Sequence, residues 1–114
     1  MPSVSADKLK GHLDPLLMAI LAGKPGHGYA IICELRDRTR GTFDLAEGTV
    51  YPALHRLQDA GLLTSDWEDV GGRRRRVYRL TDDGSVALAA ERQHWRRFAD
   101  AMDQILHAGR LQPA

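Results

Sequence analysis

Four consecutive arginines, Arg73 to Arg76, are the side chains of this sequence best suited to binding an anion. The stretch from Val70 to Leu80 contains five arginines and no acidic residue, although the formal net charge of the 114-residue chain is only +1. Arginine binds phosphate through paired hydrogen bonds and is more weakly hydrated than lysine. The local concentration of charge predicts a phosphate-binding surface of the kind that nucleic-acid-binding proteins carry, and the alternative is a solvated run of charges.

The residues around the arginines predict a β-hairpin that would present them at its tip. Gly71 and Gly72 accept the positive φ angles of a tight turn. Before the turn, residues of one strand alternate between two faces: Leu63, Ser65 and Trp67 on one, Thr64, Asp66 and Glu68 on the other. The second strand continues to Leu80. The arginines would therefore reach a minor groove or its flanking phosphates.

A helix over Glu47 to Ala60 precedes the hairpin and has two unlike faces. One arc holds the apolar residues Val50, Ala53, Leu54 and Leu57, which we expect to face the core. The opposite arc holds Gly48, Pro52, His55 and Asp59, with Thr49, Tyr51 and Arg56 at its edges. Small or flat residues allow a close approach, and the polar ones can bond to phosphates or base edges, so this face suits a major groove. Pro52 loses a hydrogen bond to Gly48, whose lack of a side chain relieves the crowding.

The N-terminal half predicts two further helices. Asp14 as N-cap and Pro15 in the first turn begin one over about residues 14 to 22, after a flexible arm over residues 1–11. Residues 24–28 are expected to form a turn, followed by a helix that opens at Tyr29 and ends before Gly41. The Tyr29 hydroxyl could hold a phosphate beside free backbone N–H groups, or its ring could pack on the core, and the two are compatible.

Thr81 is expected to cap a long last helix over Asp82 to Ala108. Its apolar residues recur with coiled-coil spacing, interrupted by Glu91: Leu88, Trp95, Phe98, Met102 and Ile105. A domain this small cannot cover such a helix by itself, so burial against a second copy of the chain is expected. Two copies related by a twofold axis would match a pseudo-palindromic DNA site.

Other classes of protein find little support in the residues. The N-terminus lacks the apolar region of a secretory signal, and no apolar stretch approaches the ~20 residues that span a bilayer, so a cytoplasmic protein is expected. The single cysteine, Cys33, cannot form an internal disulfide, and a buried inert thiol is expected. The five histidines show no metal-ligand spacing, and Gly26-His27-Gly28 is too short for a dinucleotide fingerprint. We therefore expect no metal, no cofactor and no enzymatic activity.

Three segments, LKGHLDPLLMAILAGKPGHGYAI, EGTVYPALHRLQDAGLL and GGRRRRVYRLTDDG, resemble the PadR family of bacterial transcriptional regulators. The resemblance runs from about Leu9 to Leu106 and is closest to the smaller members with one C-terminal helix. It implies a mainly α winged helix-turn-helix fold with a small β-hairpin and a homodimer, usually a repressor. The residues expected to approach DNA are Tyr29, Gly48, Thr49, Tyr51, Pro52, His55, Arg73, Arg74 and Arg75. Those expected in the dimer interface are Leu16, Leu17, Ile20, Leu88, Trp95, Phe98, Met102 and Ile105.

The expected domain layout is a flexible arm over 1–11, a winged helix-turn-helix over 12–80, a dimerisation helix over 81–108 and a disordered tail over 109–114. The resemblance also points to a small-molecule effector. Some family members respond to phenolic acids or flat hydrophobic drugs held by an aromatic residue of the last helix. Here Trp95, with Phe98 and Met102, could hold a small aromatic or phenolic effector, or these side chains could simply form interface core. Two other functions stay open: a protein-docking winged helix and a nonspecific nucleic-acid binder.

Overall fold

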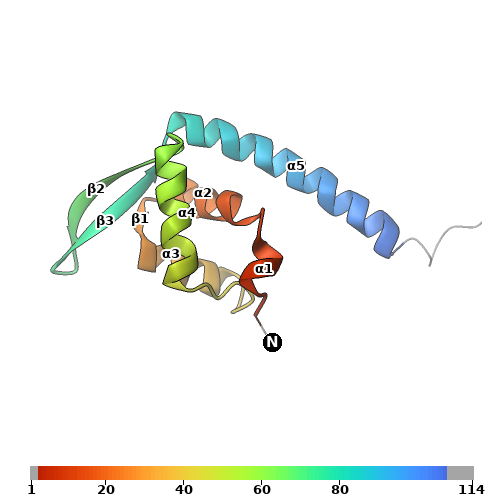
Figure 1. The fold of residues 1–114 in the computed structure, drawn as a ribbon, viewed down its shortest axis with the longest axis horizontal. Coiled ribbons are helices and arrows are strands. Elements are labelled where there is room, and N and C mark those ends of the chain that lie inside the picture. The colour runs from red at the N-terminus through yellow and green to blue at the C-terminus, as the bar shows by residue number, and fades with distance from the viewer. Residues whose placement is uncertain (1–2, 108–114) are drawn as a thin grey trace, which may run out of the picture.

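The computed structural model describes residues 3–107 and is mainly helical, with one small antiparallel sheet, as the sequence predicts (Figure 1). The helices are α1 (Ala6–Leu9), α2 (Leu13–Gly23), α3 (Gly28–Arg38), α4 (Glu47–Asp59) and α5 (Asp82–Leu106). The strands are β1 (Gly26–His27), β2 (Leu63–Val70) and β3 (Arg73–Leu80). Residues 1–2 and 108–114, which include the expected tail and the expected end of the last helix at Ala108, lie outside the described residues.

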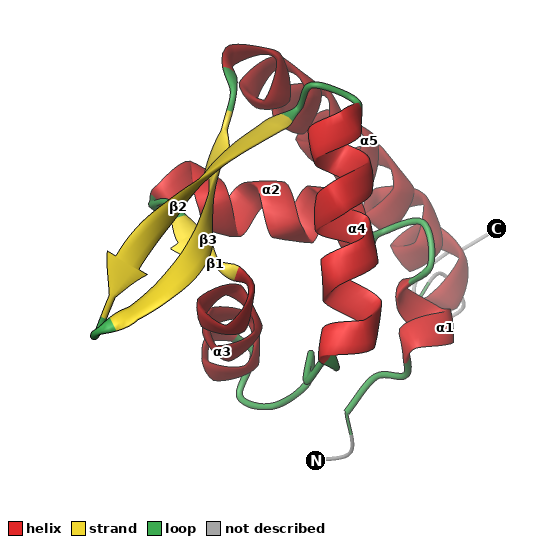
Figure 2. Cartoon of the chain, turned by 60° about the vertical axis from the view of Figure 1, so that its left-hand side comes forward, coloured by secondary structure: helices red, strands yellow, loops and turns green. Residues whose placement is uncertain are grey.

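The core lies where α2, α3 and α4 meet the inner half of the sheet (Figure 2). Each helix contributes one apolar stripe, as a period of 3.6 residues requires. The stripes comprise Leu17, Met18 and Leu21 from α2, Ile31, Ile32 and Leu35 from α3, and Val50, Ala53, Leu54 and Leu57 from α4. Leu63 of β2 and Tyr78 of β3, both buried, close the core on the hairpin side.

The sheet has the order β1-β3-β2, with all pairs antiparallel. Strands β2 and β3 form the expected hairpin, whose register runs from Leu63 opposite Leu80 to Val70 opposite Arg73. Gly71 and Gly72 make the turn with φ angles of 58° and 82°. The third strand was not expected: Gly26 and His27, which the sequence analysis places in a turn, pair with β3. Two residues are too few to show the alternating pattern of a strand in the sequence, so only the pairing with β3 reveals β1.

Helix α2 begins one residue earlier than expected, and Asp14 does not cap it. The N-cap residue is His12, which makes no side-chain capping bond, and Asp14 lies in the first turn. The Asp14 carboxylate instead forms an ion pair with the guanidinium of Arg56 in α4. The capping prediction is therefore wrong, since a charged partner from a distant helix takes the carboxylate.

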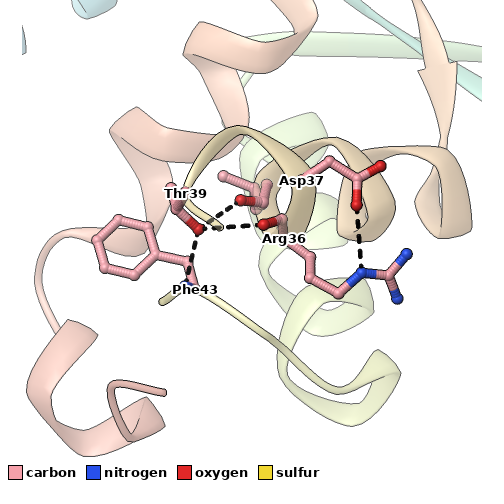
Figure 3. Close-up of polar contacts among 5 residues, drawn as sticks. Arg36, Asp37, Thr39 and Phe43 are labelled. Carbon is pink, nitrogen blue, oxygen red and sulfur yellow. Dashed lines mark hydrogen bonds and ion pairs between the residues drawn. The ribbon is translucent and has the colours of Figure 1, made fainter. Parts of the chain in front are cut away.

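Helix α3 ends at a hydrogen-bonded threonine (Figure 3). The Thr39 Oγ1 donates to the Leu35 carbonyl at 2.7 Å and accepts from the Phe43 N–H at 2.9 Å. The hydroxyl thus satisfies a carbonyl that the end of the helix leaves open and fixes the first residues of the loop to α4.

The N-terminal segment is packed rather than free, which corrects the expected flexible arm for its described part. Ser5 caps α1 by accepting from the Lys8 N–H, and Leu9 is buried in the core. The Val4 N–H also donates to the Thr42 carbonyl at 2.8 Å. Although the segment is polar in composition, buried Leu9 and the Val4 hydrogen bond attach it to the body of the protein.

Helix α5 starts at a tight junction and then leaves the body of the protein. The Thr81 Oγ1 accepts from the Gly84 N–H at 3.0 Å, as its expected capping role requires, and donates to the Gly61 carbonyl at 2.7 Å. Gly84 lies so close to the loop after α4 that an added Cβ would be 2.2 Å from the Leu62 carbonyl oxygen. Beyond this junction α5 projects outward, which gives the molecule extents of 63 × 32 × 21 Å (Figure 1).

Replacing Gly84 by alanine should therefore destabilise the fold, because the Cβ meets backbone atoms that cannot rotate away. We expect Gly84→Ala to lower the free energy of unfolding by about 2 kcal/mol, as overpacking commonly does, in urea denaturation followed by circular dichroism. Gly48→Ala is the matched control, since a Cβ at Gly48 has no atom within 4 Å and alanine favours a helix. Equal stability of the two variants would contradict the close approach.

Candidate nucleic-acid interface

Helix α4 has the two faces that the sequence predicts. Its apolar arc is buried against the other elements, with Val50 and Leu54 both 0% exposed. On the opposite arc Gly48, Pro52 and His55 are exposed, while Thr49 at its edge is half-buried. The exposed arc therefore offers backbone, a flat ring and an imidazole to a partner, with no large apolar side chain among them.

Tyr51 has a packing role that the sequence analysis did not assign. Its half-buried ring lies directly over Gly28, where an added Cβ would be 2.3 Å from Cε1 and 2.8 Å from the hydroxyl oxygen of Tyr51. Only glycine fits this position, because any side chain would displace the ring. Tyr51 thus joins α4 to the start of α3, and glycine in the Gly26-His27-Gly28 segment serves helix packing.

The start of α3 lies beside the hairpin. The His27 Nδ1 accepts from the Ala30 N–H at 3.2 Å and so caps the helix. Burial, and secondly the positive charge of Arg75, lower the pKa of His27. Its neighbour Tyr29 is 50% exposed in the first turn. Strand β3 therefore brings Arg75 to the N-terminal end of α3, where a half-exposed tyrosine and a capping imidazole already lie.

The hairpin (residues 63–80) is called the wing from here on. Its arginines differ in their exposure and in their contacts. Arg73 and Arg74 are exposed and Arg75 is half-buried. Within residues 3–107, none of these three side chains makes an ion pair with a carboxylate. Arg79, in contrast, pairs with Glu68 across the sheet. The cations near the tip are thus available to an external anion.

Arg76 differs from the rest of the run and was not singled out from the sequence. Its Nε donates to the Ser65 hydroxyl at 2.9 Å, and that hydroxyl donates to Gln58 of α4. Its guanidinium also lies 5.4 Å from the ring centroid of Trp67. The expected alternation placed Ser65 and Trp67 on one face of β2, but only the cross-strand register shows that Arg76 joins them.

The outer half of α5 forms a second surface, away from the wing (Figure 1). Trp95, Phe98, Met102 and Ile105 are all exposed large apolar side chains. Trp95 and Phe98 form a cluster with His12, the N-cap residue of α2, with ring centroids 5.5 to 5.9 Å apart. A groove between α5 and the N-terminal helices passes over this cluster and reaches Leu16 and Phe43.

Two residues expected in a dimer interface lie inside the single chain. Leu17 is 0% exposed and Leu88 is 2% exposed, so neither can face a partner, and both predictions are wrong. The inner face of α2 holds Leu17, and the first turns of α5 pack Leu88 on the same core. Leu16 and Ile20 are half-buried against that core.

Across 3–107, no group of three or more His, Cys, Asp or Glu side chains is arranged to hold a metal ion. In that span there is also no helix with the length and apolar character needed to cross a bilayer.

Comparisons with known proteins agree with this geometry. Residues 17–90 match the family model described as the Transcriptional regulator PadR-like family. The transcriptional regulator Rv3488 of Mycobacterium tuberculosis is 45% identical over 67 residues, which is 59% of this chain and 60% of that protein. A PadR family regulator from Clostridium difficile superimposes with a TM-score of 0.72 at 37% identity, covering 84% of this chain and 99% of the other. A transcriptional regulator from Clostridium thermocellum gives a TM-score of 0.80 at 25% identity over 89% and 96% of the two chains.

The fold and the exposed basic wing define a winged-helix DNA-binding regulator of transcription. More specifically, the chain belongs to the PadR family, whose model matches well over half of it. Family membership makes it a transcriptional regulator and not an enzyme.

Proposed function

We propose that this protein is a repressor that binds a pseudo-palindromic operator as a homodimer, with α4 in the major groove and the wing on the flanking DNA. One observation carries the proposal: α4 exposes its polar arc beside a wing whose tip arginines lack carboxylate partners among the described side chains. Phosphate binding requires available cations, and base reading requires polar groups on a helix narrow enough to enter the groove.

The proposed contacts divide by task. Gly48 and Pro52 allow the α4 backbone to approach DNA, while Thr49 and His55 bond to base edges or phosphates. Tyr51, held over Gly28, offers its hydroxyl at the edge of the same arc. Tyr29 and the wing residues Arg73, Arg74 and Arg75 bind phosphates and set the position of the protein on the duplex.

The dimer is proposed to form through the exposed apolar side chains of α5: Trp95, Phe98, Met102 and Ile105. An exposed apolar row of this length on a projecting helix is costly in water, and a second copy covers it without any other protein. Leu16 and Ile20 of α2 would contribute their exposed edges. In this proposal residues 12–80 read the DNA and residues 81–108 pair the subunits, in the cytoplasm.

The groove between α5 and the N-terminal helices is the proposed effector site. Its aromatic wall, Trp95 and Phe98 with His12, suits a flat aromatic or phenolic molecule, and Met102 lies further along α5. Because the same side chains would lie at the subunit contact, an effector there can change the spacing of the two reading heads and so release the operator.

Selection of bound sequences from random duplex DNA tests the reading function. We expect a twofold-symmetric consensus, a steep salt dependence and a large ratio of specific to nonspecific affinity. A salt slope without sequence preference would indicate a nonspecific binder, and no DNA affinity at all would indicate a protein-docking module.

Arg73→Ala should weaken binding to all sequences and lower the salt slope by about one, whereas His55→Ala should change base preference, by roughly 1 kcal/mol at the contacted position.

The dimer is tested by placing a charge in the apolar row of α5. Met102→Glu should convert a dimer into a monomer at micromolar concentration, measured by light scattering after gel filtration, because an unpaired carboxylate is costly to bury. Gln93→Glu is the control: it adds the same charge on the opposite face of α5, and we expect it to remain dimeric. A wild-type protein that is monomeric under these conditions would refute the dimer.

The effector site is tested by isothermal titration calorimetry with p-coumaric acid as a representative phenolic acid. We expect heat of binding with the wild-type protein and loss of that heat in Trp95→Ala, because the ring supplies the stacking surface. Gel filtration of Trp95→Ala must accompany the titration, so that loss of the dimer is not mistaken for loss of the ligand. An absence of heat from planar aromatic compounds, with operator binding intact, would remove this part of the proposal.

A further inference from the structure

A chain of side-chain contacts connects α4, which we propose as the recognition helix, to the middle of the wing. It starts at Gln58, in the last turn of α4, whose Oε1 accepts from the Ser65 hydroxyl of β2. The same hydroxyl accepts from the Nε of Arg76 in β3 at 2.9 Å. Together with Trp67, whose ring lies under the Arg76 guanidinium, these residues form what we call the α4–wing brace: Gln58, Ser65, Arg76 and Trp67.

Trp67 forms the outer end of the brace. It lies directly opposite Arg76 in the register of the hairpin, and the guanidinium of Arg76 is 5.4 Å from its ring centroid. Arg74 lies over the same ring at 5.7 Å. Trp67 is 54% exposed, so the indole is not core but a platform that restricts the two guanidinium groups.

The brace reaches further out along the wing than the hydrophobic core does. The buried residues of the hairpin end at Leu63 on β2 and at Val77 on β3, and the residues of β3 from Arg76 to the tip are all at least partly exposed. A two-stranded ribbon without packing on either face is marginally stable and twists readily. On the opposite face, the ion pair of Arg79 with Glu68 joins the two strands but not α4. Of these contacts, only the brace connects the outer wing to the recognition helix.

The brace also separates Arg76 from its neighbours in the arginine run. Arg73 and Arg74 are exposed, whereas Arg76 is half-buried and its Nε is already used by Ser65. A guanidinium engaged in this way is poorly placed to turn outward to a phosphate. Its planar guanidinium, which lies over Trp67, and its directed Nε explain the position, and lysine has neither.

We propose that the α4–wing brace fixes the angle between the recognition helix and the wing, and thereby makes groove contact and flank contact simultaneous on the same DNA. Arg76 is then a positioning residue, not a phosphate contact. The inference rests on the proposed function, in which α4 lies in the major groove and the wing lies on the flanking DNA.

The test measures coupling between the brace and the DNA flank. The probe is the duplex selected by the wild-type protein, in one form with full flanks and in one form shortened to the bases that α4 contacts. Losing a few phosphate contacts should cost the wild type roughly tenfold in affinity at low salt. Ser65→Ala, which removes the shared hydroxyl, should bind the full duplex about as weakly as the short one, so its own loss on shortening is less than about threefold.

Three further variants separate positioning from charge and from folding. Arg76→Lys keeps the charge, so it should behave like the wild type if Arg76 binds phosphate and like Ser65→Ala if it positions the wing. Ser65→Thr restores a hydroxyl on a residue type favoured in strands, so coupling to the flank should return. Ser85→Ala makes the same substitution as Ser65→Ala at an exposed position of α5 and should leave coupling unchanged.

The outcomes distinguish the two proposals. If Ser65→Ala and Arg76→Lys lose as much affinity on shortening as the wild type, the brace does not position the wing, and the proposed function stands. If the wild type selects no sequence or is indifferent to the flanks, the proposed function fails in its reading or wing part. Thermal melting of each variant accompanies the binding data, and should Ser65→Ala be unfolded, Arg76→Lys and Gln58→Ala supply the measurement.

Discussion

Helix α4 has a single apolar arc, and the burial of that arc determines how every surface of the molecule is oriented. Val50, Ala53, Leu54 and Leu57 pack on α2, α3 and β2, and each large side chain so buried contributes about 2 kcal/mol. Because the arc is buried on one side, the arc with Pro52 and His55 must face outward. The outward orientation of this polar arc is thus a consequence of core packing, and no residue of the arc itself has to specify it.

The same helix determines where the wing begins. Gly61, with a φ angle of 80°, ends α4, and the Leu62 N–H donates back to the Leu57 carbonyl at 3.0 Å. Strand β2 starts at the next residue, so the base of the wing is attached to the last turn of α4 without a flexible linker. The junction also accepts α5, since Gly84 lies against the Leu62 carbonyl. Three elements with different tasks therefore meet at one short loop.

Helix α5 serves two purposes along its length. Its first turns belong to the core through Leu88, whereas from Trp95 onward its large apolar side chains are exposed and project from the body. A rigid helix that is anchored at one end transmits its position to the other end. For this reason a contact made at Trp95 or Phe98 is mechanically connected to the loop from which the wing also emerges. The ion pair of Asp14 with Arg56 also joins α2 directly to α4.

The sequence by itself determined the elements that depend on local pattern. The helical period around Leu54, the alternation on both sides of Gly71 and Gly72, and the capping role of Thr81 all appear in the structure as expected. These features were predictable because neighbours within a few residues decide them. The same reasoning identified the exposed arc of α4 and the tip of the wing.

The tertiary structure decided everything that depends on a partner far away in the chain. Strand β1 exists only because β3 lies beside it, α1 is held by one buried leucine, and Leu17 and Leu88 face their own core although their spacing also suits an interface. The four arginines look equivalent in the sequence, yet Arg76 alone contacts a hydroxyl from the facing strand. The physical reason is that periodicity specifies which face a residue lies on, whereas only folding specifies what that face meets.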